Sequence, residues 1–133
     1  MEKLLFLASS LCFVGDIIKK YTTLKWQKIW CIYNAAIEWG RKDARWNVLD
    51  TEFFHKEWAN TIDIDLTQDN LEEKFRECDS IFVGGGDILY IAELARKHNL
   101  KKYVDMIFEK WWAYFSTSAG SMLACQETFY PHP

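Results

Sequence analysis

The chain has 133 residues, of which 50% are hydrophobic and 26% are charged. This composition is typical of a globular protein and excludes a disordered tail or a collagen-like repeat. The length is that of one domain, so we expect a single domain over residues 1–133. Sixteen Lys and Arg against nineteen Asp and Glu give a net charge of −3. No basic surplus favours nucleic acid or an anionic membrane as a partner.

The cysteine positions bear on the compartment and on metal binding. Cys12, Cys31, Cys78 and Cys125 contain no C-x-x-C pair, so neither a zinc site nor a disulfide framework is supported. We expect reduced cysteines in a cytoplasmic protein. No metal or organic cofactor is indicated. The apolar run at residues 4–8 could belong to a short signal peptide, but a buried strand explains it better.

The apolar patterning predicts elements in this order. The first half contains a strand at 3–8, a helix within 12–24, a strand at 28–33, a helical region at 35–59 and a strand at 61–66. The second half contains a helix at 71–78, a strand at 80–83, helices at 88–95 and 99–110, a strand at 111–115 and a helix at 119–126. Asp69 and Glu72 have the spacing of a capping box before the helix at 71–78, and Asp87 is placed to cap the next helix. The alternation within 61–66 indicates a strand near a sheet edge.

Alternating strands and helices predict an α/β fold, a three-layer sandwich in which helices flank a mostly parallel sheet. Flavodoxin-like proteins have this arrangement. Ligands of such sheets bind where strand carboxyl ends meet helix amino ends. Two strand-to-helix junctions, at residues 84–87 and 116–121, therefore become the candidate sites.

The second junction reads Ser-Thr-Ser-Ala-Gly-Ser over residues 116–121. Its centre differs by one residue from the G-x-S-x-G turn that exposes a nucleophilic serine on a strained strand-to-helix connection. Ser118 is the candidate nucleophile, and Ala119 and Gly120 are the small neighbours that such a turn needs. The alternative is that Ser118 only caps the following helix.

The first junction contains three consecutive glycines at residues 84–86. Bare backbone amides allow a ligand to approach closely, so the loop could bind an anion or supply part of an oxyanion hole. It is neither a Walker A loop nor a G-x-G-x-x-G dinucleotide fingerprint. A tight turn without a ligand is the alternative.

Taken together, residues 81–87 (IFVGGGD) and 114–121 (YFSTSAGS) resemble the peptidase E (aspartyl dipeptidase) family, to which cyanophycinase is related. The resemblance covers residues 3–125 and is closest over 80–123. It implies a class I glutamine amidotransferase-like fold and a serine peptidase mechanism. In that mechanism Ser118 is the nucleophile, and the amides of Ala119 and of Gly85 or Gly86 form the oxyanion hole. The substrate would be a small peptide.

The chain departs from this family after Ser118. Family members continue well beyond the serine, whereas this sequence ends at Pro133, so we expect the C-terminal strands to be missing. Pro131-His132 resembles the motif of the catalytic histidine but comes early, and Glu127 is the one acid after the serine. His132 is the candidate base, acting within the chain or across a homodimer, which uncovered apolar surface would favour.

Three functions remain open from the sequence. The first is a serine-type peptidase of the peptidase E kind. The second is a catalytically inactive relative that acts as a binding or interaction module. The third is a flavodoxin-like module that binds an anionic ligand at the two junctions. A histidine within reach of Ser118 distinguishes the first from the others.

Overall fold

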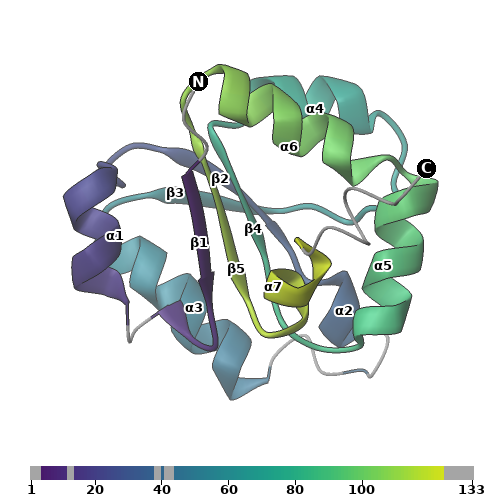
Figure 1. Ribbon diagram of the computed structural model, residues 1–133, viewed down its shortest axis with the longest axis horizontal. Helices are drawn as coiled ribbons and strands as arrows, with labels where there is room; N and C mark the ends of the chain where they lie inside the picture. Colours follow the sequence, from purple (N-terminus) through teal and green to yellow (C-terminus); the bar gives the residue numbers. More distant parts are fainter. Residues whose placement is uncertain (1–3, 12–13, 38–39, 41–43, 125–133) are drawn as a thin grey trace.

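The computed structural model describes residues 4–11, 14–37, 40 and 44–124, in which strands and helices alternate along the chain (Figure 1). The strands are β1 (Leu4–Ala8), β2 (Lys28–Ile32), β3 (Asn60–Asp63), β4 (Ser80–Val83) and β5 (Ala113–Thr117). The helices are α1 (Gly15–Tyr21), α2 (Asn34–Ile37), α3 (Arg45–Lys56), α4 (Leu71–Glu77), α5 (Ile88–Lys97), α6 (Leu100–Glu109) and α7 (Ala119–Leu123). Among these described helices, none combines the length and the hydropathy needed to cross a membrane.

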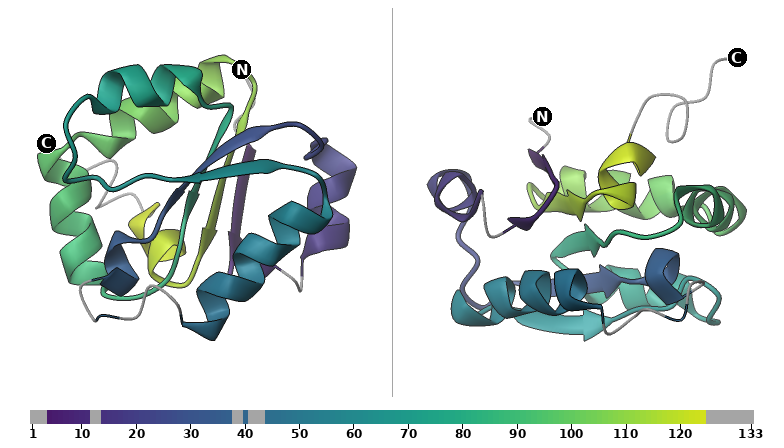
Figure 2. Two further views of the ribbon diagram at one scale, coloured as in Figure 1. Left: turned by 180° about the vertical axis from the view of Figure 1, so that it is seen from behind. Right: turned by 90° about the horizontal axis from the view of Figure 1, so that it is seen from below.

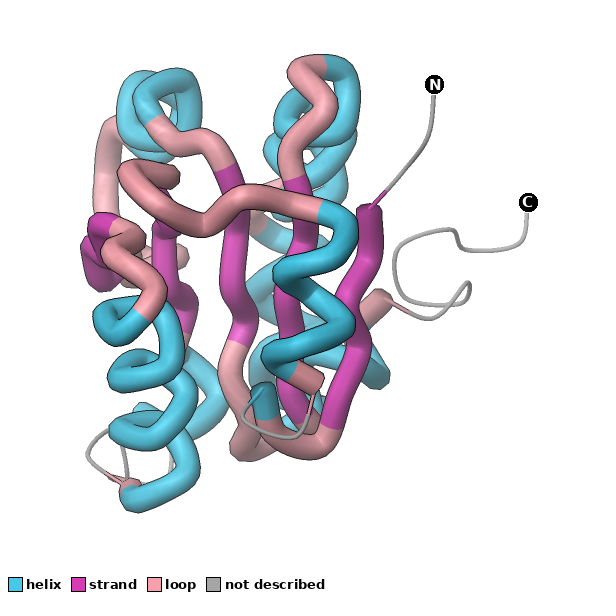
Figure 3. Tube along the Cα trace, turned by 90° about the vertical axis from the view of Figure 1, so that its left-hand side faces the viewer, coloured by secondary structure: helices cyan, strands magenta, loops and turns pink. Residues whose placement is uncertain are grey.

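The strands form one five-stranded sheet in the order β1-β5-β4-β2-β3, and every neighbouring pair is parallel. The strands run through the middle of the molecule with helices around them (Figure 3). The expected α/β fold with a parallel sheet is confirmed. β4 and β5 are neighbours, and Val83 at the end of β4 pairs with Ser116 near the end of β5. Because parallel strands end at the same edge of a sheet, the two junctions that follow β4 and β5 lie side by side.

Helices cover both faces of the sheet (Figure 2). One face packs against α4, α5, α6 and α7, and its core includes Trp30, Ile81 and Tyr114. The other face packs against α1 and α3, and its core includes Cys31 and Phe82. The central strands are apolar on both faces because both faces are covered, and this burial supplies the main favourable free energy of the fold.

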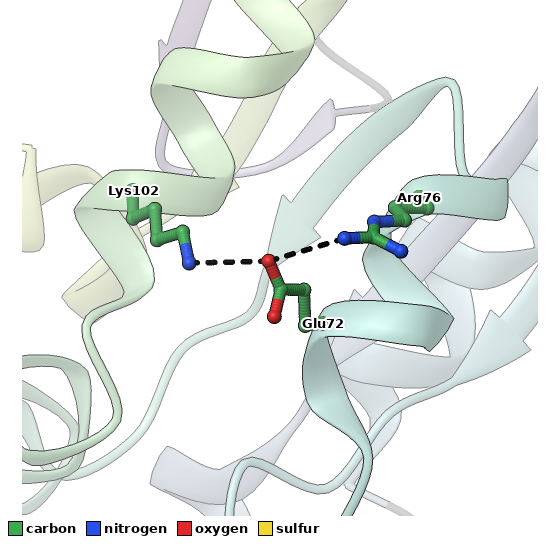
Figure 4. Close-up of polar contacts among 3 residues, drawn as sticks. All are labelled: Glu72, Arg76 and Lys102. Carbon is green, nitrogen blue, oxygen red and sulfur yellow. Dashed lines mark hydrogen bonds and ion pairs between the residues drawn. The ribbon is translucent and has the colours of Figure 1, made fainter.

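The helical layer on the first face is also connected by charges at its surface. Glu72 of α4 lies 3.4 Å from Arg76 on the same helix and 3.3 Å from Lys102 of α6 (Figure 4). These side chains are about half exposed, and exposed ion pairs add little to stability. The packing of Phe75 on Tyr103, with ring centroids 4.4 Å apart, holds α4 and α6 together more strongly.

The last strand begins two residues later than the expected 111–115. Trp111 has φ of 67° and is 63% exposed, so it belongs to the turn before β5. The strand instead continues through Ser116 and Thr117, which are both buried. Their hydroxyls form hydrogen bonds with Ser121 and Asp50, and such partners allow polar residues in a buried strand.

β3 lies at the sheet edge, as expected, but it is shorter than the expected 61–66. The Ile64 amide still donates to the Cys31 carbonyl at 2.9 Å, whereas the Leu66 amide donates to the Asn34 side chain at 3.1 Å. Ile64 and Leu66 are buried as the alternation predicted. Ile62, on the same face, is 48% exposed.

Two capping predictions had different outcomes. Asp87 is the N-cap of α5, and its carboxylate accepts a hydrogen bond from the Tyr90 amide at 3.1 Å. The capping box of Asp69 with Glu72 is wrong, because α4 begins after Asn70, which has φ of 64° and no capping side-chain bond. The helical region 35–59 is two helices, α2 and α3, rather than one.

Candidate functional site

The candidate site lies at the carboxyl edge of the sheet, where two turns approach each other. We call residues 84–87 the glycine loop and residues 116–121 the serine turn. The glycine loop connects β4 to α5, and the serine turn connects β5 to α7. The sheet order makes them neighbours although about thirty residues separate them in sequence.

Ser118 occupies a strained position at the centre of the serine turn. Its φ of 49° and ψ of −111° are sparsely populated by residues other than glycine. Such a conformation costs about 1–3 kcal/mol and persists only where the surroundings enforce it. Ser118 is exposed, and its side chain forms no capping hydrogen bond to α7. The interpretation of Ser118 as a capping serine is therefore wrong, and its hydroxyl is presented at the surface.

The glycine loop approaches Ser118 at Gly85. A Cβ added to Gly85 would lie 3.2 Å from Ser118 Cβ and 3.7 Å from Ser118 Oγ. The loop is fixed at both ends by backbone hydrogen bonds. The Gly84 amide donates to the Ile32 carbonyl, and the Asp87 amide donates to the Ala35 carbonyl, each at 3.0 Å. Gly85 and Gly86 lie between these anchors, beside the hydroxyl.

Gly86 and Gly120 are positions where only glycine fits. Gly86 has φ of 142°, and a Cβ there would lie 2.3 Å from the Ala35 backbone carbon. A Cβ on Gly120 would lie 2.1 Å from the Val83 carbonyl oxygen. The first contact brings the glycine loop close to α2, and the second packs α7 directly on the end of β4. Both contacts therefore determine how close the two turns can come.

A set of hydrogen bonds attaches the serine turn to the edge strand β1. The carbonyl oxygen of Ala8 accepts from the Ser118 amide at 2.9 Å and from Ser121 Oγ at 3.1 Å. Ser121 Oγ also lies 2.9 Å from Ser116 Oγ. On the opposite side, Tyr114 donates its hydroxyl to the Gly120 carbonyl at 2.8 Å.

Asp50 is a buried carboxylate beside the serine turn that the sequence reasoning missed. It is 1% exposed and accepts hydrogen bonds from the Leu11 amide at 3.1 Å and from Thr117 Oγ1 at 3.1 Å. Burial raises the pKa of Asp50, while the hydrogen bonds from Leu11, Thr117 and Ser10 act in the opposite direction. The sequence offered no signal for it, because Asp50 is one of five acids within residues 35–59.

A cavity of about 290 Å³ lies next to the glycine loop, between α3 and the carboxyl ends of β2 and β3. Tyr33 and Asn47 line it, and both also lie within 3.2 Å of where a Cβ on Gly84 would be. Glu52 and Asp63 line it too, and none of its lining residues is Lys or Arg. Its volume is near the lower limit for small-ligand pockets, and its lining carries negative charge.

The histidines that the structure describes lie away from the serine turn. His55 bonds through Nε2 to Thr61 Oγ1 at 2.7 Å, on the β3 side of α3. His98 is the C-cap of α5, and the ten residues of this helix separate it from the glycine loop. At about 1.5 Å per residue, the helix is about 15 Å long. His132, the candidate base, lies outside the described residues.

Other nucleophiles and metals are not assembled in the described part of the chain. Burial raises the pKa of the Cys31 and Cys78 thiols to about 12, so both are protonated at neutral pH and are poor nucleophiles. Cys12 and Cys125 lie outside the described residues. Within the described ranges, no group of three or more His, Cys, Asp or Glu could hold a metal ion.

The sequence over residues 51–132 matches the family model for peptidase family S51. This match covers more than half of the chain and includes the glycine loop, the serine turn and His132. The chain belongs to peptidase family S51. No curated protein matches it.

The fold agrees with this membership in family S51. The crystal structure of a candidate peptidase E protein from Listeria monocytogenes EGD-e superimposes with a TM-score of 0.77 at 20% identity. The superposition covers 89% of this chain and 59% of that protein. The S51 chain described here therefore spans well under two thirds of the length of that neighbour, and at this identity the likeness concerns the fold.

Proposed function

We propose that the protein is a serine-type peptidase that hydrolyses small peptides through an acyl-enzyme on Ser118. The observation that carries the proposal is the conformation of Ser118, which is strained, exposed, free of a capping bond and close to Gly85, where an added Cβ would lie 3.2 Å from Ser118 Cβ. A nucleophilic serine needs this combination, because its hydroxyl must project from the turn toward backbone amides. Membership in a peptidase family supports the same assignment.

The proposed reaction has two halves. Ser118 Oγ attacks the peptide carbonyl carbon while its proton passes to a base, for which His132 is the candidate. The amides of Ala119 and of Gly85 or Gly86 would stabilise the negative charge on the carbonyl oxygen. The C–N bond then breaks, and the amine leaves with the proton from the base. Water, deprotonated by the same base, hydrolyses the ester and regenerates Ser118.

Two further features support a peptide substrate. The cavity borders the glycine loop, because its lining residues Tyr33 and Asn47 lie next to Gly84, and its volume would hold only part of a short peptide. Its carboxylates favour a cationic group such as a peptide ammonium. We also propose a cytoplasmic location, where free thiols such as those of Cys31 and Cys78 stay reduced.

The test is labelling of the full chain with a fluorophosphonate, followed by intact and peptide mass spectrometry. We expect one adduct, on Ser118, that is absent from Ser118→Ala. Ser9→Ala, at another exposed serine, is the matched control and should label like the wild type. Absence of an adduct on folded wild-type protein would contradict the proposal and would favour the inactive binding module instead.

The role of His132 needs a separate variant. His132→Gln should lower the labelling rate of Ser118 by about 10²-fold or more, which is the usual contribution of a general base. His98→Gln is the control, because His98 is the C-cap at the far end of α5 and should leave the rate unchanged. Equal rates in wild type and His132→Gln would remove His132 from the mechanism while leaving Ser118 as the nucleophile.

A further inference from the structure

Asp50 makes contacts that its position in α3 alone does not require. Its carboxylate accepts hydrogen bonds from two segments that are distant in sequence, the loop after β1 and the end of β5. The contacts are the Leu11 amide at 3.1 Å, Ser10 Oγ at 3.5 Å and Thr117 Oγ1 at 3.1 Å. Burying a carboxylate is unfavourable unless such bonds compensate, so a purely packing role would be better served by an apolar side chain.

Both segments held by Asp50 determine the position of Ser118. Thr117 directly precedes Ser118 in the chain. The loop that contains Leu11 follows β1, whose last residue, Ala8, accepts the hydrogen bond of the Ser118 amide. Asp50 therefore connects the two sides of the contact that fixes the Ser118 backbone.

The faces of β5 show that Asp50 acts on Ser118 indirectly. Side chains alternate along a strand, so Thr117 points to the α3 face, whereas Ser116 points to the α7 face and bonds to Ser121. The carboxylate thus reaches the residue before the nucleophile rather than the nucleophile itself.

We propose that Asp50 is a positioning residue that holds Thr117 and the loop after β1 together, and thereby maintains the strained backbone of Ser118. The strain at Ser118 requires surroundings that over-determine its conformation, and the bonds of Asp50 are part of them. Asp50 also lies just before residues 51–132, the range of the family match. The link to reactivity rests on the proposed function, whereas the link to backbone geometry does not.

The decisive variant is Thr117→Val, which keeps the shape of the side chain but removes the hydroxyl. Because a buried carboxylate loses one partner, we expect the Ser118 amide to exchange with solvent about tenfold faster. We expect the fluorophosphonate labelling rate of Ser118 to fall about tenfold as well. Thr117→Ser restores the hydroxyl and should return both quantities to within about twofold of the wild type. Asp50→Asn should change both in the same direction as Thr117→Val.

Controls separate positioning from general destabilisation. Thr23→Val makes the same substitution at an exposed site and should leave both quantities unchanged. Amide exchange is measured by NMR or on short peptides around residue 118, beside exchange in β2 as an internal reference. Thr117→Val with wild-type exchange and labelling would overturn the inference, as would equal losses in Thr117→Val and Thr117→Ser. If the wild type is not labelled at all, the proposed peptidase fails, and amide exchange alone still decides the role of Asp50.

Discussion

Gly85→Ala should separate reactivity from stability. The new methyl group would lie 3.2 Å from Ser118 Cβ, which requires a shift of a few tenths of an ångström. Gly85 does not have a positive φ, so alanine adds no backbone strain. Overpacking costs about 1–3 kcal/mol, and replacing glycine where alanine fits returns about 0.4–1 kcal/mol. We therefore expect the free energy of unfolding to fall by only about 1 kcal/mol.

The effect on Ser118 should be much larger. The methyl group would lie 3.7 Å from Ser118 Oγ, in the space that a carbonyl must enter to come within about 3 Å of that oxygen. Blocking access to one oxyanion donor costs about 2.7–4 kcal/mol, so the labelling rate should fall by about 10²- to 10³-fold. Labelling kinetics and thermal unfolding are measured on the same samples. Labelling at the wild-type rate would refute the placement of the reacting carbonyl between Gly85 and Ser118.

Three further changes test other parts of the site. Gly120→Ala should destabilise the protein by about 2 kcal/mol in urea unfolding, because the clash with the Val83 carbonyl outweighs the gain of about 1 kcal/mol in helix propensity; a stabilised variant would show that α7 can move. Asp87→Ala removes the cap on Tyr90 and should cost about 1 kcal/mol, whereas Asp87→Ser should cost less than half of that, and equal losses would argue against capping. Burial raises the pKa of Asp50 above its ordinary value of 3.8, so the folded state binds this proton more tightly and the free energy of unfolding falls as pH rises from about 3.8 through the raised pKa. Asp50→Asn should lack this pH dependence. If the free energy of unfolding of Asp50→Asn and of the wild type changed in parallel with pH, the contribution of Asp50 would be excluded.

The sequence was informative where local chemistry decides the structure. Asp87 could be identified as a cap because an acid directly before an apolar helical pattern favours that role. Ser118 and Gly85 could be placed near strand carboxyl ends, since apolar runs end at Phe115 and Val83, a few residues before them. The resemblance to the peptidase E family implied only that the glycine loop and Ser118 share an oxyanion hole. The sheet order shows that β4 and β5 are neighbours, which brings the two together.

The sequence was uninformative where distant residues decide the structure. Asp50 is buried because Leu11 and Thr117, 39 and 67 residues away, provide its partners. No pattern in the sequence around Asp50 indicates partners that lie so far away along the chain. The half-buried Trp46 and the exposed Trp58 obscured the start and end of α3, since aromatic residues suggest a buried face whether or not one exists. The bounds of β5 were also missed because of distant partners. Ser116 and Thr117 are polar and did not look like buried strand residues, but hydrogen bonds to Ser121 and Asp50 allow them to continue the strand.

The place of β1 in the sheet links the serine turn to one of the two edges of the sheet. β1 is the outermost strand, pairs only with β5 among the described strands, and leaves Leu5 and Leu7 41% and 49% exposed. Peripheral strands open more readily than central ones. Since the Ala8 carbonyl accepts a hydrogen bond from the Ser118 amide, detachment of β1 would release Ser118, the proposed nucleophile, from its strained conformation while the other four strands stay paired. We therefore expect the serine turn to lose its geometry when β1 detaches, ahead of global unfolding, and an additional strand paired with β1 would hold the turn in place.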